Sequence, residues 1–171
     1  MTDAPAPRAA AEDLAADLVA RIDDRTARVL IVGQGYVGLP VSMRAVQVGF
    51  TVVGLEASPE RAAALQAGSS YVADVPDEQL HQALAAGYRP VADPAETGPF
   101  DVAIITVPTP LRDGAPDLFY VEDAAASLAR RLRAGALVVL ESTTYPGTTD
   151  ELMRPVLEQS GLKGGDEFFV G

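Results

Sequence analysis

The stretch RVLIVGQGYVGLP, residues 28–40, decides the fold. Its first five residues, an arginine and four apolar residues, are typical of a short buried strand, and a G-x-G-x-x-G pattern follows at once. Gly33 permits a tight turn, Gly35 lets backbone amides approach an anion with no Cβ in the way, and Gly38 lets the following helix pack closely. The stretch therefore predicts a strand, a glycine turn and a helix whose N-terminus suits a phosphate. A glycine turn in an unliganded βαβ unit is the alternative interpretation.

An acidic residue stands where a second strand is expected to end. Residues 51–55 form a β-branched run, and Glu56 follows it, 18 residues after Gly38. A carboxylate in this place can accept both adenosine-ribose hydroxyls of NAD and would repel the 2′-phosphate of NADP. Arg61, five residues further on, either covers the adenosine end or is a solvated surface arginine. The spacing predicts a dinucleotide site that prefers NAD.

Apolar runs and helical patterns alternate along the rest of the chain. The expected helices span residues 36–48, 59–67, 77–86, 121–132 and 149–159, and the further expected strands span residues 88–92, 101–107, 136–141 and 168–170. Strands without polar alternation, separated by helices, indicate an α/β fold: a Rossmann-type, doubly wound parallel sheet with helices on both faces. Any binding site then lies at the carboxyl ends of the strands.

The N-terminal part differs from the remainder. Residues 1–8, with two prolines among alanines, are expected to be disordered, and residues 10–24 have apolar positions at helical spacing. This short amphipathic helix is interpreted as packing on the flank of the domain, with a docking arm as the alternative. We therefore divide the chain into a flexible start with a flanking helix, residues 1–27, and one NAD-binding Rossmann domain, residues 28–171.

Composition narrows the classes of function. The 171 residues carry a net charge of −11 and contain no cysteine and one histidine. This excludes disulfides, cysteine-ligated metals, histidine-rich metal sites and a thiol nucleophile within this chain. The acidic field disfavours nucleic acid as a partner, and the apolar runs are too short to span a membrane. The N-terminus has neither a secretory nor a mitochondrial leader pattern, so a cytoplasmic location is expected.

Two more strand ends present hydroxyl groups. TVPTP, residues 106–110, predicts a stiff extended loop in which Thr109 is the hydroxyl held between two prolines. A proline-rich strand exit without function is the alternative. Ser142 and Thr143 directly follow the strand expected at residues 136–141, and they are candidates for ligand contact.

Two polar residues near the C-terminus are assigned to structure rather than to a site. Thr148, with Glu151 three residues later, fits a capping box for the next helix. The single lysine, Lys163, lies in a connection flanked by glycines and is interpreted as part of a surface loop.

Several motifs, taken in order, resemble one known family. GQGYVGLP, the GLE strand end, SYVADVPDEQL, TVPTPL, DLFYVEDA and LVVLESTTYPGTTDE are together similar to the N-terminal NAD-binding domain of the UDP-glucose/GDP-mannose dehydrogenases, from about residue 28 to the end. The VPTPL and ESTTYPGTT segments are most similar to the branch that oxidises UDP-N-acetylhexosamines at C6. The resemblance implies an NAD-dependent, two-step oxidation of the primary alcohol of a UDP-sugar to the uronate, by a full-length enzyme that is a homodimer.

The resemblance also implies roles for individual positions. The residues expected to meet the pyrophosphate are Gly33, Gly35, Tyr36 and Val37. Glu56 is expected at the adenosine ribose with Arg61 beside it. The residues expected to approach the rest of the cofactor are Val107, Pro108 and Thr143. Thr109 matches the family threonine that helps to hold a catalytic water or carboxylate near the reacting carbon.

Departures from the family pattern bear on activity. Glu56 replaces the more usual aspartate and Gln34 the more usual leucine, both compatible with NAD. The family's catalytic lysine, asparagine and cysteine, its central helix and its C-terminal sugar-binding domain follow the strand that begins at Phe168, and none is present in this sequence. We expect the chain to be the NAD-binding part of the enzyme, inactive alone. The alternative is a stand-alone NAD-binding module, regulatory or decayed; an S-adenosylmethionine methyltransferase is disfavoured by the full glycine spacing.

Overall fold

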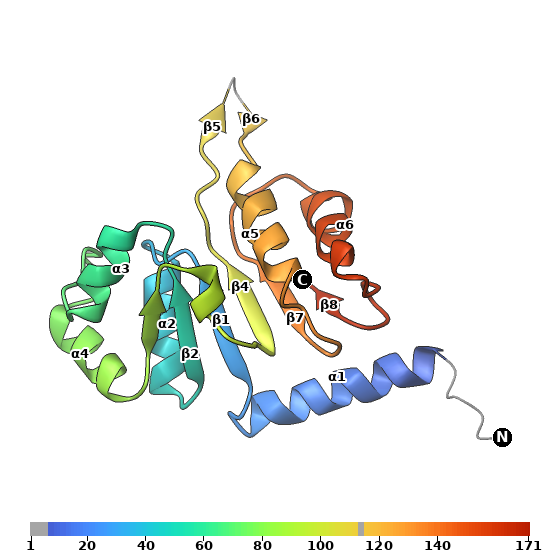
Figure 1. The fold of residues 1–171 in the computed structure, drawn as a ribbon, viewed down its shortest axis with the longest axis horizontal. Coiled ribbons are helices and arrows are strands. Elements are labelled where there is room, and N and C mark those ends of the chain that lie inside the picture. The colour runs from blue at the N-terminus through green and yellow to red at the C-terminus, as the bar shows by residue number, and fades with distance from the viewer. Residues whose placement is uncertain (1–6, 113–114) are drawn as a thin grey trace.

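The computed structural model describes residues 7–112 and 115–171, and its centre is a sheet of six parallel strands (Figure 1). In the spatial order β3-β2-β1-β4-β7-β8, the strands span Arg89–Val91, Thr51–Leu55, Arg28–Val32, Val102–Ile105, Leu137–Leu140 and Phe169–Val170. The chain moves outward from β1 through β2 and β3 on one side, and through β4, β7 and β8 on the other. This is the doubly wound sheet that the sequence predicts, with the strand order reversing between β1 and β4.

Helices cover both faces of the sheet, as expected (Figure 1). On one face pack α2, α3 and α4, which span Gly38–Gln47, Pro59–Gln66 and Asp77–Ala85. On the other face pack α5 and α6, which span Phe119–Ala129 and Arg154–Leu157. Alternate residues of β1 enter the two cores, Leu30 and Val32 on the α5 side and Val29 and Ile31 on the α2 side.

The N-terminal helix α1 is longer than the sequence pattern indicates. It spans Pro7–Asp23, so the expectation of disorder is wrong for Pro7 and Arg8, while residues 1–6 lie outside the described residues. Proline is tolerated in the first turn of a helix and the alanines that follow favour helix, which explains the earlier start. The helix runs across the end of the sheet at which the strands begin (Figure 1). Neither α1 nor any other helix in the described part of the chain is long and apolar enough to cross a membrane.

The segment before the last strand is not the single helix expected over residues 149–159. A π-helical turn, Thr148–Met153, precedes the short α6, and a 3₁₀ turn, Glu158–Ser160, follows it. Pro155 explains the interruption, because it has no N–H to donate to the carbonyl of Glu151 in a continuous α-helix.

A small hairpin is a further departure from expectation. Its strands, β5 (Leu111–Arg112) and β6 (Ala115–Pro116), pair in antiparallel fashion beyond the end at which the sheet strands finish (Figure 1). Strands of two residues have no hydrophobic period, so the sequence gives no signal for them. A short 3₁₀ turn, Pro94–Glu96, lies between β3 and β4.

One buried carboxylate fastens α1 to the sheet. Asp101, directly before β4, is 6% exposed and accepts hydrogen bonds from the Arg28 amide at 2.8 Å, from Arg28 Nε at 2.9 Å and from Arg21 Nη1 at 2.7 Å. The hydrogen-bonded Arg28 side chain is the main reason why the pKa of Asp101 falls to about 2, and the Arg28 amide and the charge of Arg21 add to the effect. Asp101 therefore joins α1, β1 and β4 as an ionised group.

We expect Asp101→Asn to lower the free energy of unfolding by about 1–2 kcal/mol at neutral pH. A carboxylate whose pKa is depressed in the folded state stabilises the fold above its unfolded pKa, here 3.8, and this stabilisation is lost as the pH falls toward 2. The variant should therefore lose less stability than the wild type over that acid range. Urea unfolding followed by circular dichroism at several pH values measures both effects.

Asp17→Asn is the matched control, because it removes the same charge from the same arginine. Asp17 pairs with Arg21 at 2.9 Å, but its side chain is 64% exposed. The expected change is below about 0.5 kcal/mol. Equal losses in the two variants would contradict the role given to Asp101.

Candidate functional site

The residues singled out in the sequence gather at one edge of the sheet, beside the point where the strand order reverses. β1 leads into the glycine turn, β2 into Glu56, β4 into residues 106–110, and β7 into Ser142 and Thr143. Backbone hydrogen bonds between neighbouring strands continue up to this edge. Segments from four places in the chain therefore meet there.

The glycine turn packs tightly against the end of β4. Gly33 has a φ of +93°, which favours glycine, and a Cβ on it would lie 2.9 Å from the carbonyl oxygen of Thr106. A Cβ on Gly38 would overlap both the Gly33 carbonyl oxygen and Thr106 Oγ1. The Thr106 hydroxyl donates to the carbonyls of Gly33 at 2.8 Å and Val32 at 3.0 Å. Two of the three glycines are therefore required by the fold itself.

Gly35 differs from the other two glycines. A Cβ on it would meet no protein atom within 4 Å, and its φ lies outside the left-handed region. Neither packing nor backbone conformation requires glycine here, so an open space remains beside the first turn of α2. Tyr36 and Val37, at the same place, are 82% and 37% exposed. No hydrogen bond within the described part of the chain occupies the amides of these three residues, which leaves them free for an anion.

Glu56 lies beside the turn, with its carboxylate held by backbone amides. The residue is 7% exposed. Its Oε1 accepts from the Ser58 amide at 3.1 Å, and its Oε2 accepts from the Gln34 amide at 3.2 Å. The Tyr71 hydroxyl approaches Oε2 at 3.2 Å, and the Arg61 guanidinium lies 5.3 Å from the centroid of the Tyr71 ring. The expected acid and arginine are thus joined by a tyrosine that the sequence reasoning missed.

The side chain of Gln34 is a buried polar group beneath the turn. Its Oε1 accepts from the hydroxyls of Tyr88 at 2.7 Å and Ser42 at 2.9 Å. Its Nε2 donates to the carbonyl of Ile31 at 2.9 Å. Gly54 leaves room for this group, since a Cβ there would lie 2.5 Å from the Tyr88 hydroxyl and 2.6 Å from Gln34 Cδ. In the sequence, this network is indicated by the polar Gln34 between two glycines.

On the other side of β1, hydroxyl groups connect the ends of β4 and β7. Thr109 Oγ1 donates to the Thr143 carbonyl at 2.7 Å, and Ser142 Oγ donates to the Val107 carbonyl at 2.7 Å. Pro108 is exposed in the loop between Val107 and Thr109. The structure thus brings together the predicted residues at the ends of both strands: Val107, Pro108, Thr109, Ser142 and Thr143. The hydroxyl protons of Thr109 and Ser142 join the two loops.

The capping box expected at Thr148 and Glu151 is wrong. Gly147, with a φ of +97°, occupies the cap position, and its carbonyl accepts from the amide of Glu151 at 2.8 Å. The Thr148 hydroxyl is buried and donates to the carbonyl of Tyr145 at 2.8 Å. Because the glycine supplies the cap, Thr148 lies one residue inside the helical turn.

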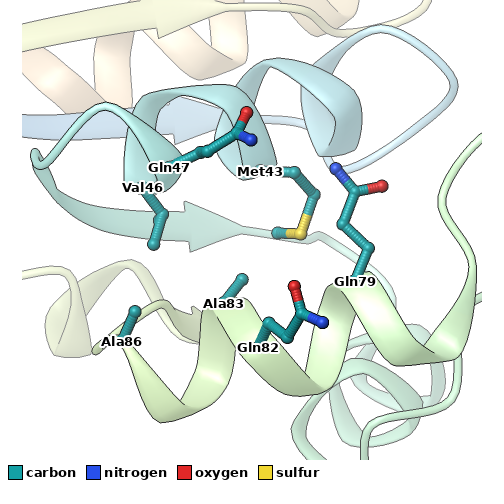
Figure 2. A pocket seen from close by; sticks show the side chains of 7 residues that line it. All are labelled: Met43, Val46, Gln47, Gln79, Gln82, Ala83 and Ala86. Carbon is teal, nitrogen blue, oxygen red and sulfur yellow. The ribbon is translucent and has the colours of Figure 1, made fainter.

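A groove between α2 and α4 lies apart from this edge of the sheet (Figure 2). Three glutamine amides stand around an apolar floor, and the lining residues are Met43, Val46, Gln47, Gln79, Gln82, Ala83 and Ala86. Met43 and Ala83 belong to the core on this face of the sheet. The groove therefore results from the packing of the two helices, and none of the predicted site residues lines it.

Comparison with known proteins matches the chain to one family. Residues 27–170 match the model of the UDP-glucose/GDP-mannose dehydrogenase family, NAD binding domain. UDP-N-acetyl-D-mannosamine dehydrogenase of Pyrococcus horikoshii is 35% identical, over 84% of this chain and 35% of that protein. UDP-N-acetyl-D-glucosamine 6-dehydrogenase of Pseudomonas aeruginosa is 38% identical, over 84% of this chain and 34% of that protein. The chain thus spans about a third of the length of these curated relatives.

Solved structures give the same result. UDP-D-ManNAc dehydrogenase from Pyrococcus horikoshii has a TM-score of 0.79 at 34% identity, over 84% of this chain and 35% of that one. GDP-mannose dehydrogenase from Pseudomonas aeruginosa, in a ternary complex, has a TM-score of 0.77 at 29% identity, over the same shares of 84% and 35%. The resemblance seen in the sequence motifs, including that to the UDP-N-acetylhexosamine branch, is confirmed, and NAD is the cofactor of this domain.

Alanine substitutions at two of the glycines should separate folding from cofactor binding. Gly38→Ala should destabilise the fold by about 1–3 kcal/mol, because its Cβ overlaps backbone and side-chain oxygens. Gly35→Ala should change stability by less than about 0.5 kcal/mol yet weaken NAD binding at least about tenfold, because the methyl group fills the space beside the free amides. Thermal unfolding and isothermal titration calorimetry with NAD measure the two effects. Normal NAD binding by Gly35→Ala would show that the space serves no ligand.

Proposed function

Because this chain belongs to the UDP-glucose/GDP-mannose dehydrogenase family, we propose that it is the NAD-binding part of a nucleotide-sugar 6-dehydrogenase. The proposed enzyme oxidises the C6 alcohol of a UDP-N-acetylhexosamine to the uronate and acts as a homodimer. The names of the two curated relatives, which specify UDP-N-acetylated sugars, support this substrate class. Since the chain spans about a third of their length, we assign cofactor binding to it and sugar binding to other parts of the proposed enzyme.

The open space at Gly35, beside a fixed acid, is the observation that carries the proposal. The free amides and the positive dipole end of α2 suit the two phosphates of NAD, with Tyr36 and Val37 at the rim of the space. The Glu56 carboxylate suits the hydroxyls of the adenosine ribose, and Arg61 flanks that end. The residues present therefore fit the family's cofactor.

The nicotinamide end of NAD is proposed to lie toward β4 and β7. Val107 and Pro108 would line the pocket on the β4 side, and Thr143 would approach from β7. Thr109 gives its hydroxyl proton to the Thr143 carbonyl, so its oxygen is left to accept a hydrogen bond from a water or a protonated carboxyl group. This is the geometry that supports a role for Thr109 in holding such a group near the reacting carbon.

The second oxidation needs a group that this chain does not contain. In the first step, a hydride leaves C6 and a proton leaves its hydroxyl, which gives the aldehyde. In the second, a thiolate adds to the aldehyde carbon, a second hydride leaves the thiohemiacetal, and water hydrolyses the resulting thioester to the carboxylate. NAD, when bound, supplies the hydride acceptor. Since the sequence has no cysteine, we propose that this chain alone binds NAD without completing the reaction.

The wild-type chain should bind NAD at least about tenfold more tightly than NADP, because Glu56 accepts the ribose hydroxyls and repels the 2′-phosphate. Glu56→Gln keeps the shape but removes the charge, so it should weaken NAD binding about tenfold and reduce the preference over NADP. Isothermal titration calorimetry with both dinucleotides at one ionic strength measures this. Glu122→Gln, which removes an exposed charge from α5, should change neither affinity. A preference of the wild type for NADP would contradict the assignment of Glu56.

The purified chain should produce no NADH from NAD and UDP-N-acetylglucosamine or UDP-N-acetylmannosamine, because sugar binding, which the first oxidation also requires, is assigned to parts of the enzyme outside this chain. The measurement is NADH absorbance over time, with a full-length relative as the positive control. Any NADH above the protein-free rate would contradict binding without turnover. A stand-alone module would also bind without turnover, and sequencing of the gene downstream distinguishes the two, because the enzyme requires a segment that carries a cysteine.

A further inference from the structure

Tyr71 connects two elements of the site that are distant in sequence. It lies in the segment between α3 and α4 and is 37% exposed. Its hydroxyl donates to the carbonyl of Gln34 in the glycine turn at 2.8 Å, and it lies 3.2 Å from Oε2 of Glu56 at the end of β2. One side chain therefore bridges the turn and the acid.

Gln34 gives this bridge a fixed anchor. Its side chain is fully buried, and the hydroxyls of Tyr88 and Ser42 both donate to its Oε1. The Ile31 carbonyl accepts from its Nε2 at 2.9 Å. The interior of the domain thus sets the position of the Gln34 backbone, and a hydroxyl bonded to its carbonyl takes a defined position as well.

The carboxylate of Glu56 has two further contacts, of about the same length as its contact with Tyr71. These are the amides of Ser58 at 3.1 Å and Gln34 at 3.2 Å, both at the long end of the usual range. Among the described residues, Tyr71 is the side-chain donor that reaches this carboxylate. Burial, and then the charge of Glu56, raise the pKa of the Tyr71 hydroxyl above its usual value, so the group keeps its proton and remains a donor.

We propose that Tyr71 is a positioning residue for the adenosine ribose, whose hydroxyl holds the Glu56 carboxylate in the orientation that accepts the ribose hydroxyls. This deepens the proposed function and rests on the role proposed there for Glu56. The Tyr71 hydroxyl shares its one proton between the Gln34 carbonyl and Glu56 Oε2, so the other lone pairs of the carboxylate stay available to the ribose hydroxyls. The Arg61 guanidinium, 5.3 Å from the ring centroid, stabilises the ring in this place.

Tyr71→Phe tests the proposal, because it removes one oxygen and keeps the ring. Titration calorimetry should show NAD binding weakened about three- to tenfold, the loss expected when a hydrogen bond to a preorganised group is removed. Cooperative thermal unfolding of the variant without NAD shows that the chain is folded. Unchanged NAD affinity would overturn the proposal, and tighter binding would overturn it too, because it would mean that the hydroxyl competes with the ribose.

A double-mutant cycle with Glu56→Ala shows whether Tyr71 acts through the carboxylate. In the Glu56→Ala background, Tyr71→Phe should change NAD affinity by less than about twofold, because nothing is left to position. An equal loss in both backgrounds would show that Tyr71 acts on the glycine turn alone, and would overturn the proposal. If Tyr71 had a purely structural role, its substitution would lower NAD affinity equally in the two backgrounds.

Two further comparisons separate this inference from the proposed function. Tyr120→Phe, which removes the hydroxyl of a tyrosine 47% exposed on α5, is the control and should leave NAD affinity unchanged. If Glu56→Ala binds NAD like the wild type, the role proposed for Glu56 fails and the inference fails with it. If Glu56→Ala weakens binding and Tyr71→Phe does not, the inference alone fails.

Discussion

The close approach of α2 to the turn that precedes it sets the geometry of the site. Because position 38 has no Cβ, the first turn of the helix lies directly against the Gly33 carbonyl, and the Thr106 hydroxyl can bond that same carbonyl at 2.8 Å. This contact places the free amides that precede α2 at the point where the strand order reverses between β1 and β4. The space at Gly35 and the loop after β4 lie at one edge for the same reason. A longer connection between β1 and α2 would separate them.

Two buried acids at opposite ends of the sheet show how a structural carboxylate differs from one that can bind a ligand. Asp101, where β4 begins, is paired with the guanidinium groups of Arg21 and Arg28, so its charge is neutralised within the fold. Glu56, where β2 ends, is held by two amides and the hydroxyl of Tyr71, all neutral donors. These donors stabilise the carboxylate and fix its direction without cancelling its charge. The charge therefore remains effective toward a ligand, either as an acceptor or as a source of repulsion.

The sequence predicts β1 and β2 to the residue, because each is a short, mainly apolar run that ends at a glycine or an acid. It predicts which residues meet at the site for a related reason: parallel strands bring their carboxyl ends to one edge. The contributions of Tyr71 and Tyr88 could not be foreseen in this way, since both lie outside the strand ends and reach the turn through tertiary packing. The helix expected over residues 149–159 takes no account of Pro155, whose missing donor interrupts the helical segment.

The charge of the chain and the charge of its cofactor have the same sign. With a net charge of −11, the long-range field opposes a ligand that carries two phosphates, and the nearby cation Arg61 is stacked on Tyr71. In the proposed site, binding therefore depends on short-range donors: the amides at Gly35, Tyr36 and Val37, and the positive end of the α2 dipole. Glu56 adds a further negative charge, which the ribose hydroxyls can compensate by donating to it, whereas a 2′-phosphate cannot. In the proposed site, the opposition of charges that makes binding depend on backbone geometry would therefore also favour NAD over NADP.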